Sequence, residues 1–237
     1  MSLQYEIEGT GKPLVYLLPA LAHVGTKAFR AIAGRQTITV ANDSPSIARW
    51  AEDVVALLAR LGVAHADFLG QSFGGVVAMT IALRHRELVD RIASHGAAFG
   101  PSEEAHDPRM LNFDAPPTPN DRTFEHFRNR HGEQWPAVWE STMRIRWNGF
   151  SKEELASIAA PVLLLVGDRD FVRIEHVVET YRRLPNAALA VIPDSGHFAL
   201  FSEPERVLPI VMHFFDEPLR RTPVATARMG FHPGETR

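Results

Sequence analysis

Three short segments of the chain hold residue types that can do covalent chemistry together. Ser72 lies in "GQSFGG", Asp168 and Asp170 lie in "GDRD", and His197 lies in "DSGHF". A serine hydroxyl attacks a carbonyl carbon effectively when a histidine takes its proton and an acid orients that histidine. Fixed N–H donors must also receive the charge that develops on the attacked oxygen. These residue types therefore indicate nucleophilic cleavage of an acyl bond.

The residues around Ser72 predict the local structure that such a serine needs. The run 65–70 is expected as a strand and 75–85 as a helix, and Gly70 and Gly74 stand two residues to either side of the serine. Glycines there allow a sharp turn that lifts the serine to the carboxyl edge of a sheet, beside an N–H group and a helix N-terminus. The alternative is a strand-to-helix turn with an incidental serine, because short matches of this kind also arise by chance.

Apolar runs of strand length alternate along the chain with stretches of helical period. The expected strands are 13–21, 37–41, 65–70, 91–95, 161–167 and 188–193. The expected helices are 44–62, 75–85, 174–184 and a last one around 205–215. Ser44 is the candidate N-cap of the first helix and Gly62 its candidate C-cap. The alternation predicts an α/β fold with a mostly parallel, doubly wound sheet and helices on both faces.

Two segments interrupt this alternation. Residues from about 98 to 155 combine a proline-rich stretch with helical pieces, and they are expected to form a small helical insertion beside the sheet. Residues 217–237 lack a sustained period and are expected to be a loosely packed tail on which the fold does not depend. The prediction is a single domain over 1–237, with its core in about 1–97 and 156–216.

A parallel sheet can bring the three chemical segments together. The carboxyl ends of parallel strands lie at one edge of the sheet, where side chains from several strands converge. Asp168 and Asp170 follow one expected strand directly, and His197 follows the next. Serine, acid and histidine then occur in a chain order known for such triads. Spacing alone does not choose between the two aspartates.

With these motifs the chain resembles the α/β-hydrolase family over roughly residues 5–216. "GQSFGG" is similar to the family's nucleophile elbow, "GDRD" to its acid loop and "DSGHF" to its histidine loop, and the insertion lies where the family carries a cap. The resemblance implies that Ser72 is the nucleophile, His197 the base and Asp170 the acid, while Asp168 braces the loop. A serine at the elbow also argues against haloalkane dehalogenase and epoxide hydrolase chemistry, for which members of the family use aspartate there.

One segment departs from the family pattern. Most members have a His-Gly pair after the first long strand, where this chain has Pro19 and Ala20. By alignment, the donors to the oxyanion are the backbone N–H groups of Leu21 and Phe73, and backbone donors survive a change of side chain. Because of this difference, the protein could alternatively be a non-catalytic ligand receptor with the same fold. The complete triad weighs against this alternative.

Four further side chains are candidates for the wall of a substrate pocket. They are His23, His95, Trp139 and Met143. The two histidines follow expected strand ends, although a surface or hydrogen-bonded buried position is commoner for a histidine. Trp139 and Met143 stand four residues apart in the insertion, on one side of an expected helix. Large apolar side chains at this spacing more often pack in a core than bind a ligand. No pair of histidines has the His-Glu-x-x-His arrangement, so no metal is expected.

The composition of the chain argues against several kinds of partner and against secretion. With 25 basic and 28 acidic residues the net charge is −3, so there is no positive excess to hold nucleic acid or an anionic membrane. The absence of cysteine excludes disulfides and thiolate nucleophiles. The N-terminal residues are acidic where a secretory signal needs an apolar core, and no apolar run is long enough for a membrane span. A soluble cytoplasmic protein is therefore expected.

These observations together predict a serine hydrolase that cleaves a carboxylic ester or related acyl bond of a small-molecule substrate without a cofactor. A C–C bond hydrolase or a cofactor-free oxygenase on the same triad stays open as an alternative. The sequence is also compatible with a homo-oligomer. Substrate identity depends on the shapes of the cap and loops, which composition does not determine.

Overall fold

A seven-stranded sheet forms the centre of the protein in a computed structural model. The structure describes residues 3–20, 22, 24, 32–41, 46–108, 129, 132–137, 147–217 and 219. Its strands are β1 (Gln4–Glu8), β2 (Lys12–Leu17), β3 (Arg35–Ala41), β4 (Ala66–Gln71), β5 (Val89–His95), β6 (Val162–Gly167) and β7 (Ala187–Ile192).

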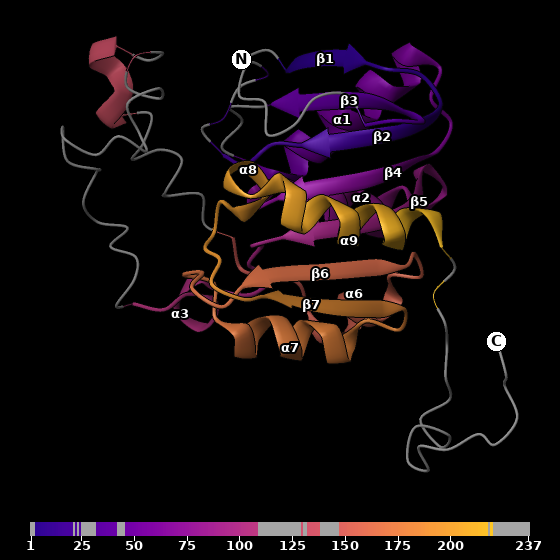
Figure 1. Ribbon diagram of the computed structural model, residues 1–237. Coiled ribbons are helices and arrows are strands. Elements are labelled where there is room, and N and C mark those ends of the chain that lie inside the picture. The colour runs from indigo at the N-terminus through magenta and orange to yellow at the C-terminus, as the bar shows by residue number, and fades with distance from the viewer. Residues whose placement is uncertain are drawn as a thin grey trace, which may run out of the picture.

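The strand order in the sheet is β1-β3-β2-β4-β5-β6-β7. The edge strand β1 runs antiparallel to β3, and every other neighbouring pair is parallel. The carboxyl ends of the parallel strands therefore lie at one edge, on the left in Figure 1. This confirms the expected α/β fold with a mostly parallel sheet.

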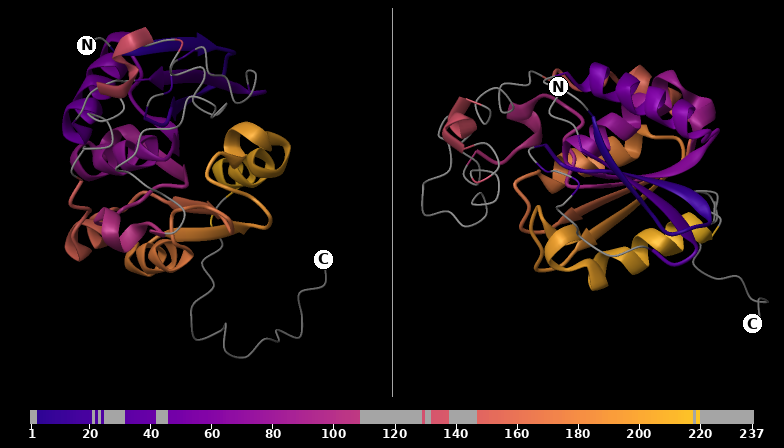
Figure 2. Two further views of the ribbon diagram at one scale, coloured as in Figure 1. Left: turned by 90° about the vertical axis from the view of Figure 1, so that its left-hand side faces the viewer. Right: turned by 90° about the horizontal axis from the view of Figure 1, so that it is seen from above.

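Helices cover both faces of the sheet. They are α1 (Ile47–Leu61), α2 (Phe73–Arg84), α3 (Ser102–Ala105), α6 (Lys152–Ser157), α7 (Ile174–Arg183), α8 (Ala199–Ser202) and α9 (Pro204–Asp216), with the 3₁₀ turns η1 (Arg86–Leu88) and η3 (Gly132–Gln134). Figure 2 shows α9 on one side of the sheet and α1 and α2 on the other.

Side chains along each strand point alternately to the two faces of the sheet, and each face has its own apolar core. On β2, Val15 and Leu17 pack in the cluster that includes α1, α2 and α7, whereas Leu14 and Tyr16 pack in the cluster that includes α8 and α9. Successive side chains of a strand point to opposite faces, so a strand covered on both faces is apolar throughout. The two cores together bury the sheet.

Several expected boundaries differ from the structure, two of them for a local reason. The first expected strand ends at Leu17 instead of residue 21, because Pro19 has no N–H to donate to the ladder. The first helix is capped by Ser46 and not Ser44, since the Ser46 side chain accepts the N–H of Arg49 at 3.3 Å. Its other end is as expected, with Gly62 in the left-handed conformation at φ 69°.

A partly buried group of charges lies at the opposite, amino edge of the sheet. Arg35 at the start of β3 donates to Asp67 of β4 at 2.5 Å and to Asp216 at the end of α9 at 2.5 Å. Lys12 lies 3.0 Å from the same Asp67 carboxylate. Arg35 and Asp67 are buried, whereas the Asp216 side chain is 59% exposed, so these contacts join two strands inside the protein and reach α9 at its surface.

The expected insertion lies in the chain between β5 and β6. Of the range 98–155, residues 109–128, 130–131 and 138–146 lie outside the described residues, as do 218 and 220–237 of the tail. The boundaries of the cap and the tail therefore stay predictions. No helix in the described part of the chain is long and apolar enough to cross a membrane.

Candidate active site

The sharp turn between β4 and α2 holds Ser72 in a strained backbone conformation. Its φ is 55° and its ψ −123°, a region that residues other than glycine rarely adopt. The Ser72 N–H donates to the His95 carbonyl at 2.9 Å, and its own carbonyl accepts the Gly75 N–H at 2.9 Å. Neighbouring backbone therefore fixes this conformation at the carboxyl end of β4.

Close backbone approach explains the glycines around Ser72. A Cβ atom at Gly70 would lie 2.4 Å from the Gly75 nitrogen. At Gly74 it would lie 2.1 Å from the carbonyl oxygen of Leu17, at the end of β2. Since no side chain tolerates such contacts, the glycine pattern seen in the sequence follows from the packing of Gly70 against the start of α2 and of Gly74 against the end of β2.

His197 and Asp170 form a buried pair at the same edge of the sheet. His197 Nδ1 lies 2.9 Å from Asp170 Oδ1, and His197 is 7% exposed and Asp170 6% exposed. The same Asp170 oxygen accepts the Val172 N–H at 2.9 Å. Because a carboxylate only accepts, His197 Nδ1 carries a proton toward Asp170 and leaves Nε2 as the basic nitrogen.

Asp168 has a different position from Asp170. Its carboxylate accepts the Ser195 N–H at 3.2 Å, which joins the loop after β6 to the loop after β7. The pKa of Asp168 lies below its ordinary value, chiefly because the carboxylate accepts the backbone N–H of Asp194. The structure thus brings Asp170, and not Asp168, to His197, and Asp168 braces the loop.

The first turn of α2 presents an N–H group beside Ser72. Phe73 is the first helical residue, and within the described part of the chain its N–H has no acceptor. The second expected donor, Leu21, lies outside the described residues. The end of β2 contacts the same turn at Gly74, where a Cβ atom would meet the carbonyl oxygens of Leu17 and Leu18.

The strained serine turn, the buried histidine–acid pair and a mostly parallel sheet agree with a comparison against family models. Residues 9–210 match the model described as "Alpha/beta hydrolase family". The chain belongs to the alpha/beta hydrolase family.

Individual relatives of this alpha/beta hydrolase support a hydrolase activity. The 2-hydroxymuconate semialdehyde hydrolase of Pseudomonas putida is 26% identical over 200 residues, covering 73% of this chain and 70% of that protein. Bifunctional epoxide hydrolase 2 of Sus scrofa is 30% identical over 155 residues, which cover 55% of this chain and only 27% of that protein. A meta-cleavage product hydrolase (CumD) of Pseudomonas fluorescens IP01 has a TM-score of 0.74 at 19% identity, covering 90% of this chain and 93% of that chain.

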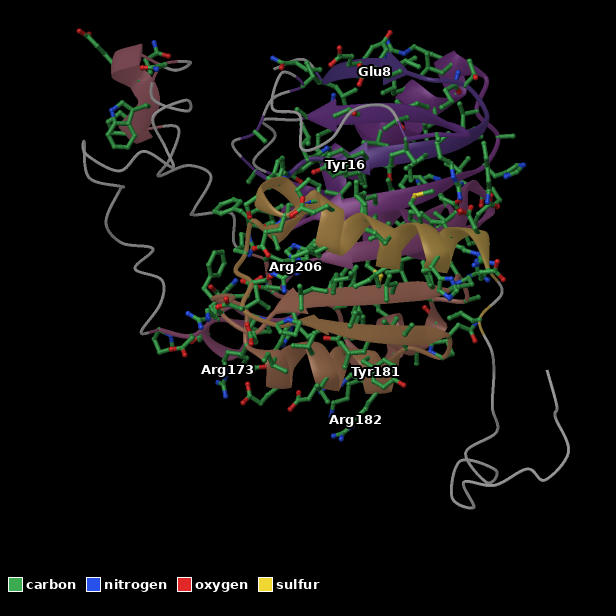
Figure 3. The ribbon with its side chains drawn as sticks, in the orientation of Figure 1. Glu8, Tyr16, Arg173, Tyr181, Arg182 and Arg206 are labelled. Carbon is green, nitrogen blue, oxygen red and sulfur yellow. The ribbon has the colours of Figure 1, made fainter. Side chains whose placement is uncertain are left out.

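The described start of the expected cap contacts the acid loop of this hydrolase. The Asp107 N–H donates to the Phe171 carbonyl at 2.8 Å, and the Arg173 N–H donates to the Ala105 carbonyl at 2.8 Å. Figure 3 shows Arg173 beside the short helix α3 that leads into this contact. The last residue of α3 and the backbone after it therefore hold the loop that carries Asp170.

Aromatic rings enclose His197 from two sides. The Phe171 ring lies 3.9 Å from the His197 ring between centroids, and the Phe198 ring makes an edge-on contact at 5.1 Å. His106 packs on Phe171 at 5.8 Å, and burial lowers its pKa. Phe171, Phe198 and His106 were not among the residues predicted from the sequence, although the two phenylalanines directly follow Asp170 and His197.

The four expected pocket residues have different outcomes. His23, Trp139 and Met143 lie outside the described residues, so their roles stay predictions. His95 lies at the carboxyl end of β5, as expected, but its side chain is 0% exposed and lies 3.0 Å from the Gln71 side chain. This interior, hydrogen-bonded position is the one stated above to be commoner for a histidine, and a place for His95 in the pocket wall stays a prediction. Within the described ranges, no three potential metal ligands lie together.

Proposed function

We propose that this hydrolase cleaves a carboxylic ester or a related acyl bond of a small molecule, with Ser72 as nucleophile, His197 as base and Asp170 as orienting acid. The observation that carries the proposal is the buried 2.9 Å contact between His197 Nδ1 and Asp170 Oδ1, at the sheet edge where Ser72 is strained. Each of the three residues has an environment suited to its role.

In the first half of the reaction, His197 Nε2 takes the proton of the Ser72 hydroxyl while the Ser72 Oγ bonds to the carbonyl carbon. The Phe73 N–H, together with that of Leu21, donates to the resulting oxyanion. His197 then gives the proton to the leaving oxygen, and the bond to the alcohol breaks. Asp170 accepts from the imidazolium Nδ1 throughout and keeps the ring oriented.

In the second half, a water molecule replaces the alcohol. His197 Nε2 takes one of its protons, and the oxygen attacks the acyl carbon. The bond to Ser72 Oγ breaks, His197 returns the proton to Ser72, and the acid leaves. In this proposal Ser72 serves as nucleophile, His197 as base and the Phe73 N–H as donor in both halves.

Cleavage of a carbon–carbon bond next to a carbonyl is the second candidate. The relative from Pseudomonas putida favours it, because its name assigns it 2-hydroxymuconate semialdehyde as substrate and it aligns over 73% of this chain. The leaving group would then be a carbanion that needs a proton on carbon. The epoxide hydrolase relative supports neither candidate, because epoxide hydrolases of this family use an aspartate where this chain has Ser72.

Two measurements test the proposal. A serine-directed phosphonate is expected to label Ser72 in the wild type, and Ser72→Ala is expected to abolish labelling and ester turnover while the melting temperature stays the same. Removal of one member of a triad typically lowers turnover by on the order of 10⁴ to 10⁶. Unlabelled Ser72 in folded protein, across several small phosphonates, would contradict the proposal and favour the ligand receptor.

A substrate comparison separates the two candidates. The wild type is assayed with acyl esters of varied chain length and, in parallel, with 2-hydroxymuconate semialdehyde. A larger kcat/KM for an ester supports the first candidate, and a larger kcat/KM for the semialdehyde supports the second. Ser72→Ala is the control in both assays, since each candidate depends on this residue.

A further inference from the structure

His95 lies where the nucleophile, the base and the acid of the proposed triad meet. It is the last residue of β5, between β4 and β6 in the sheet. Its backbone carbonyl accepts the Ser72 N–H at 2.9 Å, so this residue already fixes the nucleophile through the main chain. Its side chain points into the fully buried interior.

The His95 side chain reaches His197 through Gln71. Gln71 Nε2 donates to the His197 carbonyl oxygen at 2.6 Å, and Gln71 Oε1 lies 3.0 Å from His95 Nδ1. A carbonyl oxygen only accepts, which settles the orientation of the Gln71 amide. His95 Nδ1 must therefore carry the proton and donate to Gln71. Both side chains are 0% exposed, so water cannot replace these bonds.

Burial keeps this histidine neutral. It lowers the pKa of His95 to about 4, so the ring is uncharged near neutral pH. The Gln71 contact needs a proton on Nδ1, and the neutral ring can carry its single N–H proton there. Asp170, His197 and Glu203 are the ionisable groups whose charges affect His95.

The next residue, Gly96, contacts the other two members of the proposed triad. A Cβ atom here would lie 2.9 Å from Asp170 Oδ2 and 2.9 Å from His197 Nδ1, and φ is +59°. Only a glycine leaves room for the pair at this distance. The backbone after β5 therefore packs against the acid and the base, while His95 holds the nucleophile and, through Gln71, the histidine loop.

We infer that Gln71 and His95 are positioning residues that set the distance between Ser72 and His197. The inference rests on the proposed triad. Gln71 directly precedes Ser72, so its bond to the His197 carbonyl joins the nucleophile turn to the histidine loop by one side chain. His95 orients that side chain by occupying its oxygen. A shift of about 1 Å in such an alignment is enough to slow catalysis strongly.

Four variants test this inference with the full-length protein. His95→Leu removes the donor to Gln71, His95→Asn keeps a donor near the position of Nδ1, and Gln71→Leu removes both bonds. Thr180→Val is the matched control, because it removes a buried hydroxyl that donates only to a carbonyl of its own helix α7. All are assayed for kcat and KM with the best ester and for melting temperature.

We expect kcat to fall about tenfold or more in His95→Leu and Gln71→Leu, with KM changed less than about twofold. His95→Asn is expected to recover most of the loss, and Thr180→Val to keep the wild-type kcat. A purely structural role would instead lower the melting temperature and leave the kcat of the folded fraction unchanged. That result, or a His95→Asn variant as slow as His95→Leu, would overturn the inference.

Two further controls separate this inference from the proposed function. If Ser72→Ala stays active, the proposed function fails. If it is inactive while Gln71→Leu keeps the wild-type kcat, only the positioning role fails. Nitrogen NMR of labelled histidines gives a readout without turnover, since we expect His95 to be neutral with its proton on Nδ1 at pH 7. A proton on Nε2 instead would contradict the inferred chain of hydrogen bonds.

Discussion

Gly74 lies against Leu17 so closely that a methyl group on Gly74 would come within 2.1 Å of the Leu17 carbonyl oxygen. The contact ties the nucleophile turn to the end of β2. Gly74→Ala is expected to lower the free energy of unfolding by about 2 to 3 kcal/mol and to reduce kcat, because the turn must move away from β2. Urea unfolding and ester turnover measure the two effects.

Gly62→Ala is the matched control for this prediction. Gly62 also has a special conformation, at φ +69°, but no atom lies within 4 Å of a Cβ placed on it. We expect Gly62→Ala to lower the free energy of unfolding by about 1 kcal/mol and to leave kcat unchanged. Equal losses of kcat in the two variants would show that the contact with Leu17 does not align the nucleophile.

The two aspartates of the acid loop are expected to respond differently to removal of their charge. Asp170→Asn should lower kcat by roughly 10³- to 10⁴-fold, because the amide no longer orients and stabilises the protonated ring of His197. Asp168→Asn should mainly lower stability, since Asp168 accepts the Ser195 N–H away from His197. Turnover and melting temperature distinguish them, and the reverse pattern would exchange the two roles.

The buried Arg35 is expected to matter more for stability than exposed arginines do. Arg35→Met leaves Asp67 with Lys12 as its remaining cationic partner and removes the bond to Asp216, so we expect a loss of about 3 kcal/mol in unfolding free energy. Arg49→Met breaks an exposed pair with Asp53 and should cost less than about 0.5 kcal/mol. Similar losses in urea unfolding would refute the distinction.

Because of the buried His176, we expect the protein to lose stability in mild acid. Its Nε2 accepts the Phe99 N–H at 3.0 Å where the insertion begins, and burial lowers its pKa from 6.5 to about 4. Between these pH values the unfolded chain binds more protons than the folded protein, so stability is full above pH 6.5 and declines as the pH falls toward 4. The difference between the two pKa values corresponds to a loss of at most roughly 3 kcal/mol in unfolding free energy.

A variant without the titrating ring tests the source of this acid sensitivity. His176→Gln keeps an acceptor for the Phe99 N–H but does not titrate. We expect a shallower dependence of unfolding free energy on pH, measured in urea at several values from pH 7.5 down to about 4.5. His95 retains its own lowered pKa in this variant, so part of the slope should remain. An unchanged slope would assign the whole effect to other groups.

The sequence by itself determined the elements and the local geometry of the nucleophile turn. Apolar alternation and glycine positions are local properties, so the strand at β4, the helix α2 and the elbow around Ser72 were predictable within a few residues. The end of helix α1 at Gly62 was also predictable, because a left-handed C-cap favours glycine. The N-cap was not, since both Ser44 and Ser46 have a side chain that can accept an N–H.

Tertiary structure alone decided which side chains meet. Asp168 and Asp170 have the same residue type two positions apart, and only the packing of the loops after β6 and β7 places Asp170 at His197 and Asp168 at the Ser195 N–H. The same holds for Gln71, whose partners His95 and His197 are 24 and 126 residues away. Contacts over such separations depend on sheet order and loop packing, which no local pattern in the chain encodes.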